Sequence, residues 1–258
     1  MLRMFLECNE KIFKLIIMMN LKLYKKIWED TARDVRVLTT GAEIITPYNL
    51  KTAVPKLERL RRYAVKDYES ARTLVDSISR LLETDVIFDD PAMSSTKDIL
   101  FGLLEEYARD ASIAPGEKVA VNSNTIAIET VVFPTEQIES EDVVIGDSYT
   151  FQSMTLSAEA LNLARTATEK PRLQLFAYSN ELFFHWGKDR EWMENLTQIP
   201  SEDGVDFGNN WRVLSMSFDG VKIQNLTEPI VYTVPVSDPG NNSQWVCAFW
   251  ETEGKSHD

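Results

Sequence analysis

Few residues in this sequence have types and spacings suited to catalysis. Histidine occurs only twice, at His185 in the run FFHWGKDR and at His257 near the end of the printed sequence. His185 and Asp189 could form half of a catalytic dyad, but no serine nucleophile motif lies near them. We therefore interpret His185 as an imidazole at a strand end beside aromatic side chains. We predict no catalytic residues and no enzyme activity.

Candidate metal ligands are equally sparse. No cysteines or histidines recur at the spacing of a zinc site. The acidic loop PTEQIESEDVV carries four carboxylates that could bind calcium, those of Glu136, Glu139, Glu141 and Asp142. This loop lacks the D-x-[DN]-x-[DN]-G spacing of a calcium loop, so we interpret it as a solvated charged loop. Neither a G-x-G-x-x-G nor a P-loop motif occurs, and we expect no metal and no cofactor.

One of the two cysteines has an unusual setting. Cys247 stands in the run WVCAFW among Trp245, Phe249 and Trp250, whereas Cys8 lies in the N-terminal stretch. The sequence alone does not pair them. In a cytosolic protein Cys247 would be a small buried hydrophobic residue, and in a secreted protein it would need a disulfide partner. Both interpretations stay open on this evidence.

Three N-x-[ST] sequons favour an extracellular location. Because such sequons accept glycans in secreted proteins, we predict N-glycosylation at Asn195, Asn225 and Asn241. The apolar stretch from Ile12 to Leu21 does not decide the compartment. It is too short to span a bilayer, and Lys14 and Asn20 interrupt it. The status of residues 1–30 therefore stays open.

Length and charge set broader bounds. The chain has 258 residues, enough for one large domain or two modest ones with real cores. Its formal net charge is -13. A surface this acidic repels phosphate backbones, so we expect no nucleic-acid partner.

Residues 31–115 have the hydrophobic period of helices. In the stretch VPKLERLRRYAVKDYESARTLVDSISRLLET, apolar residues recur at intervals of three and four, which predicts a helix with Pro55 in its first turn. Ser95 with Asp98 resembles a capping box that starts a second helix. Pro115-Gly116 is a strong breaker and should end this helical region.

Residues 116–258 change to the period of two that is typical of strands. The run RLQLFAY places Leu173 and Leu175 on one face and Phe176 on the other, and Asp219-Gly220 between two alternating runs predicts a hairpin. Helices followed by many short strands indicate segregated layers rather than βαβ units. The predicted fold class is α+β, with an N-terminal helical subdomain followed by an antiparallel β-sandwich.

The C-terminal part of the sequence carries a more specific pattern, LTEPIVYTVPV followed after a loop by WVCAFWE. This pattern resembles the start of the GPS motif of adhesion G protein-coupled receptors, L-x-x-P-V-x-[FY]-T and then C-x-F-W. The first half is matched by Leu226, Pro229, Ile230, Tyr232 and Thr233, with isoleucine in place of valine. The second half is matched by Cys247, Phe249 and Trp250.

The resemblance implies the GAIN fold, a helical subdomain with a sandwich, over roughly residues 35–254, and it is closest to latrophilin-like receptors. Segments 156–162 and 173–184 look like further parts of that domain. The GPS-like part would begin near residue 226. Cys247 would pair with a later cysteine of the motif that this sequence does not contain, and Phe249 and Trp250 would pack in the sandwich.

The resemblance also implies a function. The chain would be an extracellular, membrane-proximal module of a receptor, acting in signal transduction and cell adhesion and shielding the segment that activates the seven-transmembrane region. Its partners would be that seven-transmembrane region and an extracellular protein ligand. It would lie on the extracellular side of the cell membrane, or be secreted if the chain ends at Asp258.

Two further expectations follow from the resemblance. Self-cleavage in the family uses a His-Leu-Thr or His-Leu-Ser turn, and neither tripeptide occurs here, so we predict that the chain as given does not cleave itself. The family's final strand is also absent from the printed sequence, which would leave backbone groups unpaired and make the isolated chain poorly stable or aggregation-prone.

An alternative function of another class is a secreted or polycystin-like β-sandwich that serves adhesion or carbohydrate binding without receptor signalling. An enzyme ranks third, because a fold by itself never excludes a grafted site.

Overall fold

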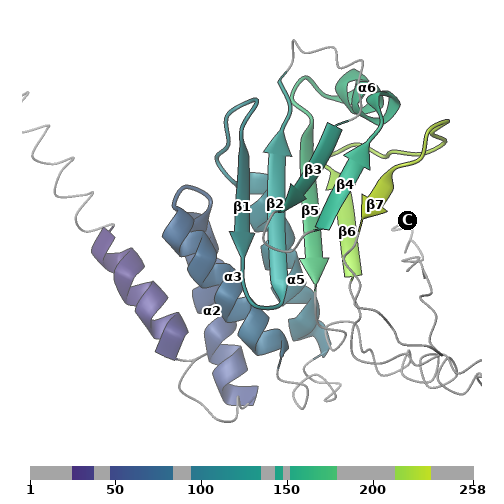
Figure 1. The fold of residues 1–258 in the computed structure, drawn as a ribbon. Coiled ribbons are helices and arrows are strands. Elements are labelled where there is room, and N and C mark those ends of the chain that lie inside the picture. The colour runs from purple at the N-terminus through teal and green to yellow at the C-terminus, as the bar shows by residue number, and fades with distance from the viewer. Residues whose placement is uncertain are drawn as a thin grey trace, which may run out of the picture.

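The computed structural model describes residues 25–37, 47–83, 94–134, 143–147, 152–178 and 213–233. These residues form three layers (Figure 1). Helices pack on one face of a four-stranded antiparallel sheet, and a three-stranded antiparallel sheet with one more helix packs on its other face. This arrangement confirms the predicted α+β fold class, with helices first and two facing antiparallel sheets after them.

The predicted long helix is two helices, so this prediction was wrong in one respect. Helix α2 spans Pro47–Ala64 and helix α3 spans Tyr68–Leu82. Asp67 breaks the helix between them in an extended conformation, and its carboxylate accepts hydrogen bonds from Ser70 N at 2.8 Å and Ser70 Oγ at 2.6 Å. The apolar stripe runs on through the break because both helices bury it in the same core.

The predicted place of Pro55 was also wrong. Pro55 lies inside α2, because the helix begins eight residues earlier at Pro47, and Pro47 rather than Pro55 occupies the first turn. The upstream turns belong to the helix because Leu50 and Ala53 are fully buried in the core. That burial offsets the one intrahelical hydrogen bond that an interior proline cannot donate.

Two further helices complete the helical layer. Helix α5 spans Ser94–Asp110, so Ser95 lies inside its first turn instead of capping it. The predicted breaker is confirmed, because α5 ends before Pro115 and Gly116 takes a φ of 85° that favours glycine. A helix over residues 25–37 is tied to α3 by a 2.9 Å hydrogen bond from Arg36 Nη2 to Thr73 Oγ1.

The four-stranded sheet has the order β1-β2-β5-β6, with every neighbour antiparallel. Its strands are β1 (Lys118–Asn122), β2 (Ile126–Val132), β5 (Arg172–Tyr178) and β6 (Val213–Phe218). The predicted alternation in β5 is confirmed. Phe176 packs in the core shared with the helices, whereas Leu173 and Leu175 pack in a second core on the opposite face.

The three-stranded sheet closes this second core. It has the order β3-β4-β7, with β3 at Val143–Asp147, β4 at Gln152–Leu156 and β7 at Val231–Thr233. Helix α6, at Ala158–Ala167, follows β4 directly and packs its apolar side into the same core. The core is built from Phe133, Met154, Leu156, Leu161, Ala164, Leu173, Leu175 and Phe218.

The predicted Asp219-Gly220 turn is present, but the hairpin is shorter than expected. Gly220 has a φ of 69°, and Val221 N donates to Phe218 O at 3.1 Å. Beyond this single bridge, residues 222–230 form no strand. Val221 and Ile223 instead pack their side chains against the second core. The boundary between helical and sandwich subdomains at residues 115 and 116 stays a prediction.

Candidate functional site

The first half of the GPS-like pattern ends on the edge of the three-stranded sheet. Strand β7 pairs with β4 in the register Thr155↔Val231, Met154↔Tyr232 and Ser153↔Thr233. Directly opposite residues in an antiparallel pair share a face. Tyr232 therefore lies on the face of the fully buried Met154, toward the second core, and Val231 and Thr233 lie on the outer face.

The inner face of β7 is only partly covered by described residues. The Tyr232 side chain is 41% exposed even though it lies on the core side of the sheet. Its partial burial raises the pKa of its phenol above the ordinary value. Two residues earlier, Ile230 packs against the second core. This part of the chain is therefore anchored by an apolar contact and by strand pairing.

A third anchor is electrostatic and comes from α6. The Glu159 carboxylate accepts hydrogen bonds from Thr227 N at 2.7 Å, Glu228 N at 3.1 Å and Thr227 Oγ1 at 3.1 Å. The Glu228 N–H contributes most to lowering the pKa of Glu159, and the Thr227 groups add to it. We call these three hydrogen bonds the Glu159 latch.

Local sequence places Glu159 correctly for this latch. Ser157 caps α6 through a 3.2 Å hydrogen bond from Ala160 N to its Oγ, which fixes where the helix starts. Ala160 and Leu161 are fully buried and orient the first turn against the second core. Glu159 therefore lies on the open side of that turn, facing the segment that leads into β7.

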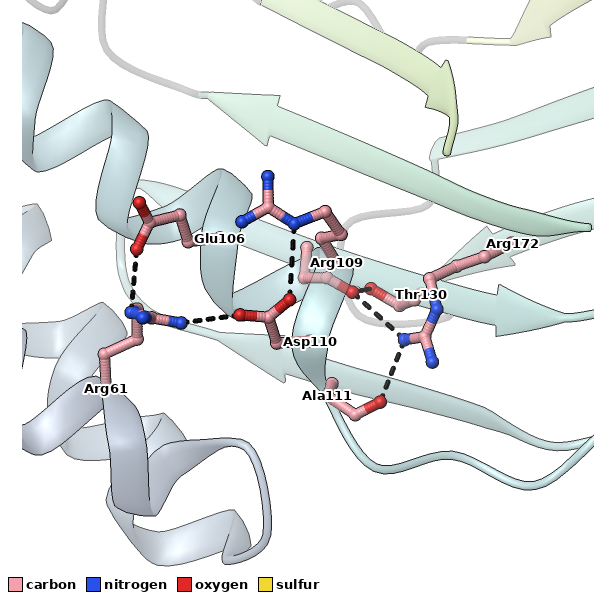
Figure 2. Close-up of polar contacts among 8 residues, drawn as sticks. Arg61, Glu106, Arg109, Asp110, Ala111, Thr130 and Arg172 are labelled. Carbon is pink, nitrogen blue, oxygen red and sulfur yellow. Dashed lines mark hydrogen bonds and ion pairs between the residues drawn. The ribbon is translucent and has the colours of Figure 1, made fainter. Parts of the chain in front are cut away.

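The sandwich that carries this segment is joined to the helices at the C-terminus of α5 (Figure 2). Arg172 Nη1, from β5, donates to Ala108 O at 3.2 Å and to Ala111 O at 2.9 Å. Thr130 Oγ1, from β2, also donates to Ala108 O at 3.4 Å. Two strands thus satisfy carbonyls that the end of a helix leaves without intrahelical partners. We call this set of hydrogen bonds the Arg172 clamp.

Ion pairs extend this junction to α2, as Figure 2 shows. Arg61 Nε lies 2.8 Å from Glu106 Oε2, and Arg61 Nη1 lies 2.7 Å from Asp110 Oδ2. Arg109 Nε reaches the other Asp110 oxygen at 3.2 Å. These pairs are partly exposed, so each contributes modestly and their main effect is to align α2 with α5.

Only some of the predicted site residues fall in the described part of the chain. Pro229 is exposed just before β7, which contains Tyr232 and Thr233. Asn225 is exposed and has a φ of 58°, a turn conformation that leaves its side chain accessible. The remaining predicted residues lie outside the described residues: Cys247, Phe249, Trp250, Asn195, Asn241, His185, Asp189 and the acidic loop with Glu136, Glu139, Glu141 and Asp142.

Glu159 and Arg172 were not singled out by the sequence. The signal for Glu159 was the pattern of a serine cap followed by an acidic residue in the first helical turn. Arg172 is the first residue of a strongly apolar strand, and the sequence of that strand does not indicate that Arg172 bonds to carbonyls at the end of α5. Both partners lie more than sixty residues away in the sequence.

The described residues offer no site for a metal ion, since no group of three or more histidine, cysteine, aspartate or glutamate side chains gathers among them. Of the helices in the described ranges, none has both the length and the apolar character needed to cross a bilayer.

Comparisons with known proteins find likeness in structure and not in sequence. No family model matches the chain, and no curated protein matches it. Among solved structures, the fold is similar to the full extracellular region of zebrafish Gpr126/Adgrg6, with a TM-score of 0.54 and 11% sequence identity. The match covers 88% of this chain and 30% of that one. At this identity the likeness shows the fold alone.

Proposed function

We propose that the chain is an extracellular, membrane-proximal module of an adhesion-type G protein-coupled receptor and is not an enzyme. Two independent lines support this proposal. The GPS-like residues of the sequence resemble that receptor family, and the fold is similar to the extracellular region of an adhesion receptor over 88% of the chain.

The observation that carries the proposal is the way the segment 225–233 is held. Ile230 anchors it in the second core, β7 pairs with β4, and the Glu159 latch binds its backbone. A module that shields a following segment must fix the strand that leads into it. Three different kinds of contact within nine residues provide that fixation.

The shielding role can be tested in a chimeric receptor. This chain replaces the matching module of a signalling adhesion receptor, and that receptor keeps its own sequence after the module. Basal signalling and surface expression are then measured. We expect basal signalling well below that of a receptor lacking any module, because the docked segment holds the following region in place.

Two variants sharpen this experiment. Glu159→Gln keeps the size of the side chain but weakens the latch, and should raise basal signalling at equal surface expression. Glu169→Gln is the matched control, since Glu169 is exposed beyond the end of α6. If the chimera signals as strongly as the receptor without a module, the proposed function is wrong. If the two variants behave alike, the latch has no part in it.

A further inference from the structure

A polar groove lies between α3 and the turn that joins β1 to β2. Its volume is about 390 Å³, which falls in the size range of small-molecule sites. Every side chain that lines it carries a polar atom. Such a lining suits a ligand rich in hydroxyl and charged groups, and does not suit an apolar one.

Hydrogen bonds tie α3 to the β1–β2 turn beside the groove. Ser79 Oγ bonds to Thr125 Oγ1, and both hydroxyls lie 3.1 Å from Glu83 Oε1. In the turn itself, Ser123 Oγ accepts a hydrogen bond from Ile126 N at 2.9 Å. The turn is therefore held against α3 before any ligand arrives, which lowers the entropy cost of binding.

The α3 side of the groove presents two guanidinium groups around one carboxylate. Arg72 and Arg80 lie on either side of Asp76 along the helix, and the Arg72 pair with Asp76 is loose at 4.0 Å. Partial burial raises the pKa of Asp76, against the influence of these arginines and of Arg36. Within the described ranges, Arg80 forms no hydrogen bond or ion pair with a side chain. Arg80 is thus available to an anion, and Arg72 is held only by its loose pair with Asp76.

The remaining lining adds hydrogen-bonding amides and one aromatic ring. Asn122 and Asn124 line the turn side, and Tyr68 lies at the N-terminal end of α3 with 53% of its surface exposed. Tyr68 and Glu83 are about 22 Å apart along the helix axis at 1.5 Å per residue. The site is therefore longer than a single sugar ring.

We propose that this groove binds an acidic oligosaccharide. Arg72 and Arg80 pair with its carboxylate or sulfate groups, Asp76 and the turn amides bind its hydroxyls, and the Tyr68 ring packs on the apolar face of a sugar. The site does not depend on the proposed receptor function, because a secreted module could carry it equally well.

Other ligand classes fit this groove less well. A divalent cation would be repelled by Arg72 and Arg80. A nucleic acid carries a phosphate on every nucleotide, so Asp76 and Glu83 would oppose it. An acidic peptide carries a charge on most residues and few hydroxyls, so Asp76 and Glu83 would oppose it. A sugar such as hyaluronan, with one carboxylate in every two rings, brings several hydroxyl donors with each charge, which matches the mixture of arginines and carboxylates.

The test is calorimetric titration of the full chain with a hyaluronan hexasaccharide and a heparin-derived hexasaccharide, which separate carboxylate from sulfate recognition. A chitin hexasaccharide serves as the neutral ligand and hexaglutamate as the acidic peptide. Arg80→Gln removes a groove cation, and Arg59→Gln removes an exposed arginine of α2 outside the groove as the charge-matched control. Tyr68→Ala is a second groove variant at an exposed position that should leave folding intact.

We expect at least one acidic hexasaccharide to bind, with affinity falling as salt rises. Arg80→Gln should weaken binding by about tenfold or more, the loss typical of a charged hydrogen bond, whereas Arg59→Gln should change it less than about twofold. The proposal is overturned if neither acidic hexasaccharide binds, if both arginine variants weaken binding equally, or if hexaglutamate binds as tightly. Thermal melts of each variant show whether a loss of affinity is a loss of fold. If Arg80→Gln unfolds, Tyr68→Ala takes its place: weaker binding supports the proposal, and unchanged binding overturns it.

Discussion

Replacing Arg172 by methionine should destabilise the whole fold, because the Arg172 clamp joins the helical layer to the four-stranded sheet. Methionine keeps the apolar stem of the arginine and removes its guanidinium. The substitution therefore leaves Ala111 O, on a buried residue, without the 2.9 Å hydrogen bond that it now accepts. Ala108 O loses its bond at 3.2 Å but keeps the longer one from Thr130.

The size of the effect follows from the kind of bond that is lost. A hydrogen bond from a charged donor contributes roughly 1.5–3 kcal/mol. One nitrogen makes both bonds, so we count about one full bond and not two. Arg172 is half-buried, and water can replace part of the interaction. We expect the free energy of unfolding to fall by about 2 kcal/mol.

Urea denaturation followed by far-UV circular dichroism measures this loss. The midpoint should fall, while the slope and the single transition stay unchanged, because helices and sheet share one core. Arg109→Met is the control. Its ion pair with Asp110 is exposed, so it should cost less than about 0.5 kcal/mol. Equal losses for the two variants, or separate transitions for helices and strands in the wild type, would refute this reasoning.

Four other predictions can be checked with standard methods. Asp67→Ala removes the N-cap of α3 and should lower the free energy of unfolding by about 1 kcal/mol in the same urea assay, with the helix content of the folded state unchanged. The pKa of Glu159 is lowered in the fold, so the stabilisation from its carboxylate is present above the ordinary pKa of 4.5 and is lost as pH falls through the lowered pKa. The melting temperature of Glu159→Gln should therefore drop less on acidification than that of the wild type. Asn225→Gln should remove one glycan from the chain secreted by mammalian cells, seen as a faster band that matches partial deglycosylation; an unchanged band would mean that the exposed Asn225 is not modified. The purified chain should run as a single species on a denaturing gel, and two fragments divided within this sequence would contradict the expected lack of self-cleavage.

Local periodicity was enough to predict much of the fold. The side-chain pattern of β5 assigned Leu173 and Phe176 to opposite faces, because alternation along a strand is a property of the backbone and needs no partner. The turn at Asp219-Gly220 was equally local, since glycine permits the positive φ found there. The change of period near residue 116 falls between the end of α5 and the start of β1 for the same reason, although it gave no sign of α6 among the later strands.

Contacts between distant parts of the chain decided the rest. The apolar stripe gave no sign of the break at Asp67, because two helices on one core continue the same stripe. The place of β7 beside β4 depends on which edge the second core leaves open, and alternation along a strand does not specify its neighbour. Glu159 and Arg172 find their partners 68 and 64 residues away, so only the folded chain brings a single carboxylate to Thr227 and a single guanidinium to Ala108. The sequence by itself therefore determined which regions are helical or extended and which faces are apolar, whereas the tertiary structure decided where several elements begin and end and which polar side chains hold them together.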